Sequence, residues 1–263
     1  MADQLDRRGT GLHWNVTFVR AARAIIAGDT DHAEQLATEA LQIGTDSGQP
    51  DASVIFGAPL ISISSQRGTL GDLISLIEQA VAENPGIPRL RSSLAMAHAQ
   101  AGRTDDARRL LEEFSAAEFE LPLDYTWLTG MVYYAEAATE CRDPQYAQPL
   151  LDRLAPWADQ WCSNGISNAG PVSHYLGSLA AVLGRYDEAD AYFAKSAALN
   201  DRMGAKFYAA STDLSWGKML AERQAPGDTD KARKLLTKAH SAAATHGYAN
   251  VERRAAEALQ HLD

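Results

Sequence analysis

Apolar residues recur three and four positions apart along most of the chain, with polar and charged residues between them, which is the spacing of amphipathic helices. The segment LGRYDEADAYFAKSAALN shows this pattern clearly. Gly184 and Tyr186 precede Ala189, and Phe193 and Ala197 continue the same apolar stripe. We therefore expect a tight turn at Gly184, where glycine tolerates a positive φ, followed by an amphipathic helix.

The same arrangement occurs six times. In each copy a small, polar or turn residue stands about five positions before an Ala or Leu, and another apolar residue follows four positions later. The copy near residue 147 has Arg142 in the place of the glycine. The six anchoring residues are Ala33, Leu73, Ala107, Ala147, Ala189 and Ala232. A second helix-length segment precedes every copy, so each unit is predicted to be a helical hairpin.

A single helical hairpin cannot bury its apolar faces, so neighbouring hairpins must stack into a continuous core. We expect an all-α fold: a right-handed superhelical solenoid of about six hairpins and a C-terminal capping helix, forming one domain over residues 1–263. No strand is expected. The run SVIFG lies in a helix-length segment, and residues 163–171 resemble a linker. The predicted units cover residues 12–46, 50–85, 87–116, 123–161, 171–202 and 204–247, with the cap at 249–262.

Composition restricts the classes of function. The chain has 34 acidic and 24 basic residues and a formal charge of −10, and its basic residues stand in short groups separated by acids. This distribution argues against direct binding of nucleic acid. Cys141 and Cys162 are too few for a disulfide framework and suit a reducing compartment. No signal peptide or membrane-spanning run is evident, so a cytoplasmic location is expected.

Several residues carry a family resemblance. Leu176 and Gly177, the stretch GRYDEA and the following Phe193 resemble a tetratricopeptide repeat, and Trp216 and Pro85 match positions of that repeat in other units. The units are longer than the usual repeat of about 34 residues. In this respect they are similar to the divergent, tetratricopeptide-like superhelix at the C-terminus of large bacterial signalling regulators.

A longer stretch, from WLTGMVYYAEAATECRDPQYAQPLLDRL to GPVSHYLGSLAAVLGRYDEADAYFAKSAALNDRMGAKF, resembles the C-terminal helical region of bacterial multidomain ATPase regulators of the STAND type. Members of that group are joined to nucleotide cyclase domains or to LuxR-type DNA-binding domains. The resemblance implies a sensor or protein-interaction arm, with catalysis or DNA binding on other domains. The chain itself has no GxxxxGK[ST] phosphate loop.

Motifs for catalysis and metal binding are incomplete. Gly165, Ser167 and Ala169 approximate a GxSxG nucleophile elbow, but the last glycine is missing and no strand is expected before the turn. Ser215 and Lys218 have the SxxK spacing without its companion motifs. The histidines form neither HExxH nor a pair four residues apart. We therefore expect no enzymatic activity, no metal and no cofactor.

In tetratricopeptide arrays the first helix of each hairpin lines the concave surface, and the resemblance implies the same geometry for the hairpins of this chain. It places a mixture of charged, polar and apolar side chains on the groove: Arg89, Ser92, Met96, Gln100, Val132, Glu136, Glu140, His174 and Ser178. Such a mixture suits an extended segment of a protein or peptide, including another domain of the same regulator. The alternative is a small effector that bridges two units and changes the curvature of the array.

Aromatic residues are concentrated between residues 125 and 175. Packing in the core is expected to account for most of them. Adjacent Tyr133 and Tyr134 are not expected to point inward together on one helix. The candidates for contact with a ligand are Trp127, Tyr133, Trp161 and Tyr175.

Overall fold

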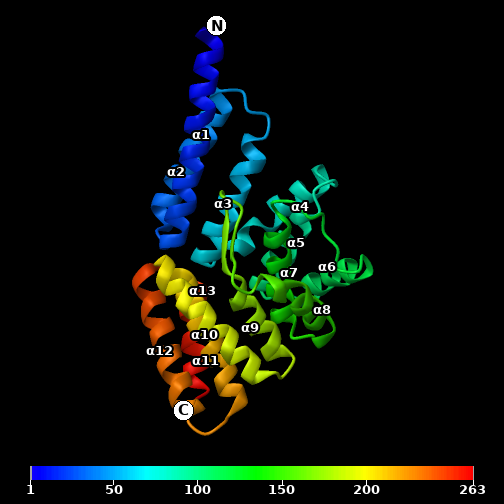
Figure 1. The fold of residues 1–263 in the computed structure, drawn as a ribbon, viewed down its shortest axis with the longest axis vertical. Coiled ribbons are helices and arrows are strands. Elements are labelled where there is room, and N and C mark those ends of the chain that lie inside the picture. The colour runs from blue at the N-terminus through cyan, green and yellow to red at the C-terminus, as the bar shows by residue number, and fades with distance from the viewer. Residues whose placement is uncertain (1, 263) are drawn as a thin grey trace.

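A computed structural model describes the backbone of residues 2–262 and the side chains from residue 13 onward. The described chain is built almost entirely from α-helices, with two short 3-10 helices and one pair of short strands (Figure 1). The prediction of an all-α fold is therefore confirmed. Among the described residues, no helix has both the length and the apolar character that crossing a membrane demands.

The helices follow one another with short connections. The first half of the chain contains α1 (Ala2–Ala27), α2 (Thr30–Asp46), α3 (Ala52–Arg67), η1 (Leu70–Leu73), α4 (Ile74–Glu83), α5 (Arg89–Gln100) and α6 (Thr104–Ala116). The second half contains α7 (Trp127–Cys141), α8 (Pro144–Leu154), η2 (Ala155–Trp157), α9 (Val172–Val182), α10 (Tyr186–Met203), α11 (Lys206–Arg223), α12 (Asp228–His246) and α13 (Ala249–Gln260). The run SVIFG lies in α3, so its prediction as helix is confirmed.

Neighbouring helices pack closely where the sequence has small residues. The anchoring residues Ala33, Ala107, Ala147, Ala189 and Ala232 are all fully buried, whereas Leu73 is half-buried. Since an alanine leaves little bulk between two helices, these positions bring the backbones of paired helices together.

Gly177 gives a second close approach, between α9 and α10. A Cβ atom at Gly177 would lie 2.9 Å from the ring of Phe193, which is fully buried. At the turn before α8, Arg142 replaces the expected glycine and adopts a left-handed conformation with φ of +51°. Its guanidinium donates hydrogen bonds to Glu222, so the side chain adds a contact that glycine could not make.

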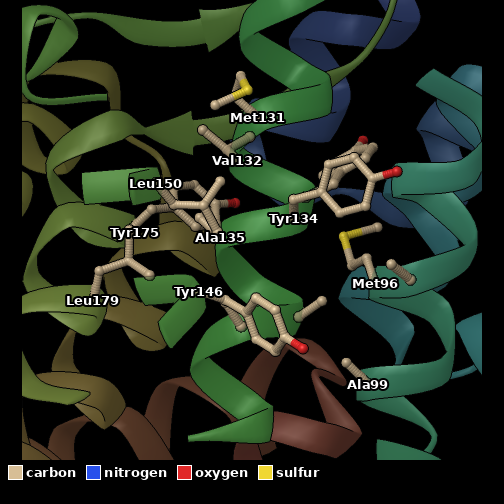
Figure 2. Close-up of a cluster of buried hydrophobic side chains, with 14 of the residues drawn as sticks. Met96, Ala99, Met131, Val132, Tyr134, Ala135, Tyr146, Leu150, Tyr175 and Leu179 are labelled. Carbon is tan, nitrogen blue, oxygen red and sulfur yellow. The ribbon is translucent and has the colours of Figure 1, made fainter. Parts of the chain in front are cut away.

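Helix α7 lies at the centre of the largest apolar cluster, in contact with α5, α6, α8 and α9. Figure 2 shows Met96 and Ala99 of α5 on one side of α7 and Tyr175 and Leu179 of α9 on the other. Because α7 is covered on several sides, Tyr133 and Tyr134 are both buried, and the expectation that only one points inward is wrong.

Residues 161–171 form a β-hairpin, which corrects the interpretation of residues 163–171 as a linker and the expectation that the chain has no strand. Strand β1 (Trp161–Ser163) pairs antiparallel with β2 (Asn168–Pro171). The Asn164 carboxamide accepts hydrogen bonds from the backbone N–H groups of Ile166 and Ser167, and Gly165 adopts a φ of +85°. The Asn-Gly pair is a common turn of short hairpins, so the sequence did contain a signal for it.

The hairpin connects distant helices through one buried side chain. Asn168 donates from Nδ2 to the carbonyl of Ala22 in α1 at 3.0 Å, and its Oδ1 accepts a hydrogen bond from Trp161 Nε1 at 3.1 Å. The backbone carbonyl of Asn168 accepts a further bond from the Tyr208 hydroxyl of α11 at 2.7 Å. Strand β2 is thus held between α1 and α11.

We expect Asn168→Ala to lower the free energy of unfolding by about 2 kcal/mol, because the change removes two hydrogen bonds, to the Ala22 carbonyl and from the partly buried Trp161 indole N–H, and leaves the indole without its acceptor. Urea denaturation of the variant would measure this effect. Asn15→Ala, at an exposed position of α1, is the matched control and should change the stability by less than about 0.5 kcal/mol. Equal effects of the two substitutions would show that Asn168 does not hold the hairpin in place.

The N-terminal helices α1 and α3 are in contact with helices from the C-terminal part of the chain. Helix α1 packs against α11, and α3 packs against α13. The turn after α1 meets the residue before α13, where the Tyr248 hydroxyl donates to the carbonyl of Gly28 at 3.3 Å. A Cβ atom at Gly68, in the turn after α3, would lie 2.9 Å from the backbone nitrogen of Asn250. The C-terminal helix therefore closes back on the N-terminal helices.

Candidate functional site

The helices surround a central, partly open cavity of about 100 Å³. Residues from α3, α5, α7, β2, α9, α11 and α13 line this cavity, so its wall includes helices from both ends of the chain. The lining combines hydroxyl, carboxamide and carboxylate groups with tyrosine, methionine and aliphatic side chains. A cavity of mixed chemistry with a few converging polar groups is typical of a binding site for a small molecule.

Most of the residues expected on the groove meet at this cavity. Eight of the candidates line it: Met96, Gln100, Tyr133, Glu136, Glu140, His174, Tyr175 and Ser178. They come together because α5, α7 and α9, which the repeat pattern assigns as first helices, present the same face to the interior.

The other five candidates lie elsewhere. Ser92 and Val132 are fully buried and do not line the cavity. Trp161 packs edge-on against Tyr208, with 5.3 Å between the ring centroids. Arg89 and Trp127 line a separate recess of about 370 Å³.

A chain of hydrogen bonds runs across one wall of the cavity. The Gln100 amide donates from Nε2 to Glu136 Oε1 at 2.6 Å and contacts Ser65 Oγ at 2.8 Å. Burial raises the pKa of Glu136 to about 7 against the opposing hydrogen bond from Gln100; nearby Glu140 contributes to the increase and Arg254 opposes it. Glu136 is therefore a carboxylate whose surroundings only partly compensate its charge.

A second polar group, His174, borders the cavity from α9. Its Nδ1 lies 3.2 Å from the Thr212 hydroxyl, which also contacts Ser196 and Asn200 in the interior. Burial lowers the pKa of His174 to about 4, and Arg254 lowers it as well. His174 is thus neutral at pH 7.

An ion pair connects the central helix to the C-terminal helix. Arg254 Nη2 of α13 lies 2.7 Å from Glu140 Oε1 of α7, and both side chains are about one quarter exposed. On α11, burial lowers the pKa of Lys218, which lines a small adjoining recess with Glu140 and Arg254. The pair therefore separates the central cavity from a more basic neighbouring surface.

Sequence reasoning missed the parts of the wall that come from α3, α11 and α13. The same first-helix rule, applied to the hairpins at 50–85 and 204–247, would have found Ser62, Ser65 and Ser211. No signal in the sequence indicated Arg254, because α13 reads as a simple cap until its contact with α3 is known.

The stretch that resembles a nucleophile elbow does not expose its serine. Ser167 is almost fully buried in the hairpin turn, where its hydroxyl contacts Asn164. Burial raises the pKa of the Cys162 thiol to about 12, so the nucleophilic thiolate is not populated at neutral pH. Within the described residues, no three His, Cys, Asp or Glu side chains lie close enough together to hold a metal ion.

No protein-family model matches the chain, and no curated protein is similar enough to match it. The central cavity and its lining groups therefore provide the basis for a functional proposal.

Proposed function

We propose that the chain is a non-enzymatic sensor module that binds a small molecule in the central cavity. In this proposal the helices form six stacked hairpins of a right-handed superhelix, closed by α13. One observation carries the proposal: side chains from helices that are far apart in the sequence meet around a cavity containing the incompletely compensated Glu136. A bound ligand would contact both ends of the superhelix.

Binding at this place would bias the shape of the whole module. The N-terminal and C-terminal helices meet through a small set of contacts, such as the hydrogen bond from Tyr248 to Gly28. A ligand that prefers the closed arrangement shifts the population toward it by the difference in its affinity for the two arrangements. In a multidomain regulator of the kind that the sequence resembles, this shift would be transmitted to neighbouring domains in the cytoplasm.

A screen of small metabolites by thermal denaturation tests this function. A ligand present at about one hundred times its Kd should raise the Tm by about 5–10 °C, because binding to the folded state alone stabilises that state. Ser211 borders the cavity from α11 and Ser241 is exposed on α12. We expect Ser211→Leu to abolish the Tm shift by filling the cavity and Ser241→Leu, the matched control, to preserve it.

The second candidate function is binding of a protein or peptide segment at the outer recess near Arg89 and Trp127. This recess is lined by apolar residues of α3 and by the loop before α7, and Leu123 and Tyr125 are about four-fifths exposed in that loop. Exposed apolar residues beside a recess are typical of interaction surfaces. A partner that binds wild type and Ser211→Leu equally, but loses affinity when Leu123 and Tyr125 are changed to serine, would favour this function over the first.

A further inference from the structure

The charges around the central cavity do not balance. Glu136, Glu140 and Arg254 are the charged side chains that line it, and His174 is neutral at pH 7. Glu140 and Arg254 form an ion pair at 2.7 Å, so their charges offset each other. Glu136 remains, with the Gln100 amide as its hydrogen-bond donor among the described residues. When Glu136 is ionised, the cavity therefore carries a net charge of about −1, which a cationic ligand would neutralise.

The hydrogen-bonding groups of the wall agree with this charge. An ionised carboxylate can accept about four hydrogen bonds, and Glu136 accepts one from Gln100. The Gln100 amide must turn its N–H group toward Glu136, since the opposite orientation would place two acceptors against each other. Its Oε1 is then left buried without a donor. The Glu136 carboxylate thus keeps unused acceptor capacity at the cavity, and a primary ammonium group supplies three donors from one atom.

The aromatic side chains of the wall are a third feature that favours a cationic ligand. Two tyrosines of the wall use their hydroxyls internally: Tyr175 donates to the carbonyl of Ala169 and Tyr208 to that of Asn168, both at 2.7 Å. These hydroxyls are committed to the protein, so the contribution of Tyr175 and Tyr208 to the cavity comes from their rings. Aromatic faces attract cations and also pack against aliphatic groups.

We propose that the central cavity binds a small organic amine as its ammonium ion, with the charged nitrogen against the Glu136 carboxylate and an aliphatic part against Met96 and the tyrosine rings. The inference rests on the proposed sensor function and specifies its ligand. A cavity of about 100 Å³ limits the buried part of the ligand to a few non-hydrogen atoms. Butyl-sized amines are therefore suitable probes.

The test uses the full chain with 13C-labelled methionine methyl groups, observed by NMR. Met96 lines the cavity, whereas Met203 is exposed at the end of α10 and reports non-specific effects. The probes are n-butylammonium, 1-butanol and butyrate, which have similar size and different charge. We expect n-butylammonium to shift the Met96 signal saturably, with an affinity at least about tenfold higher than that of 1-butanol, and butyrate to leave the signal unchanged.

Two variants examine the role of the carboxylate. Glu136→Gln should weaken the binding of n-butylammonium at least about tenfold, because it removes the counter-ion and keeps the shape. Glu39→Gln, on the exposed face of α2, is the matched control and should bind like wild type. The comparison of the three probes on wild type stands even if Glu136→Gln does not fold.

The outcomes separate the two proposals. Tighter binding of 1-butanol or butyrate than of n-butylammonium at Met96 would overturn the cationic ligand and leave the sensor cavity intact. A metabolite screen in which no compound stabilises wild type, together with an unshifted Met96 signal for all three probes, would overturn both. If the capped peptide Gly-Lys-Gly bound more tightly than n-butylammonium, the ligand would be a lysine side chain of a protein segment, and the proposal of a small molecule would be overturned.

Discussion

Tyr248→Ala should lower the free energy of unfolding by about 3–5 kcal/mol, the range for truncation of a large buried aromatic side chain. Tyr248 is fully buried, and its ring packs against Phe207 with 5.2 Å between the centroids. The side chain also lies in the apolar cluster formed by α11, α12 and α13. Its removal leaves a cavity at the place where the C-terminal helices meet the turn after α1. The lost stability therefore comes from the buried apolar area and from the weakened contact between these two parts of the chain.

Two control variants separate the contribution of the buried ring from that of the hydroxyl and from the effect of truncating an exposed tyrosine. Tyr248→Phe keeps the ring and removes a hydrogen bond that is long at 3.3 Å, so its cost should be below about 1 kcal/mol. Tyr125→Ala makes the same truncation at a side chain that is 78% exposed and should cost less than about 0.5 kcal/mol. Urea denaturation measures all three, and equal losses for Tyr248→Ala and Tyr125→Ala would contradict the closure.

Hydrogen exchange gives a local readout of the same change. If Tyr248 holds the ends of the chain together, its truncation should speed amide exchange in α1 and α3 more than in the central helix α7. These helices contact α11 and α13 through residues distant in sequence. Uniform acceleration across the molecule would indicate a general loss of stability without selective opening.

The helical architecture was predictable because its signals are local. The repeated turn and the small anchoring residues, such as Ala107 and Ala189, specify paired helices from about fifteen residues of sequence at a time, and both alanines are fully buried. The candidate residues Gln100, Glu136 and His174 line one cavity since they share the inward face of first helices. The prediction of that part of the wall came from the tetratricopeptide resemblance, which implies that first helices line the concave surface.

The features that could not be predicted depend on contacts between distant segments. Arg254 joins the wall because α13 returns to α3 and α7, and the capping-helix interpretation contains no information about that return. Tyr133 and Tyr134 are both buried because neighbours cover several faces of α7, whereas an amphipathic pattern assumes a single buried face. The hairpin at Asn164 was missed for another reason: its strands are too short to show an alternating pattern.

The pH dependence of stability should reveal two buried groups that act in opposite directions. Glu136 has its pKa raised by burial to about 7 from an ordinary value of 4.5, so the folded state binds more protons than the unfolded state between these values. Its contribution to stability is present below pH 4.5 and is lost as the pH rises through 7. His174 has its pKa lowered by burial from 6.5 to about 4, so its contribution is present above pH 6.5 and is lost as the pH falls through 4.

The two effects offset each other between pH 4.5 and 6.5, and single variants should separate them. Relative to wild type, Glu136→Gln should be nearly neutral near pH 4.5 and should become more stable with rising pH, by up to about 3 kcal/mol at pH 8, because it removes an incompletely compensated buried charge. The neighbours Gln100, Glu140 and Arg254 are unchanged in this variant. Urea denaturation at several pH values gives the measurement.

His174→Gln should show the opposite trend. It removes the group that costs stability at low pH, so its stability relative to wild type should rise by up to about 3 kcal/mol as the pH falls from 6.5 to 4. The double variant should lack both slopes. If the difference between Glu136→Gln and wild type were independent of pH, burial would not raise the pKa of Glu136.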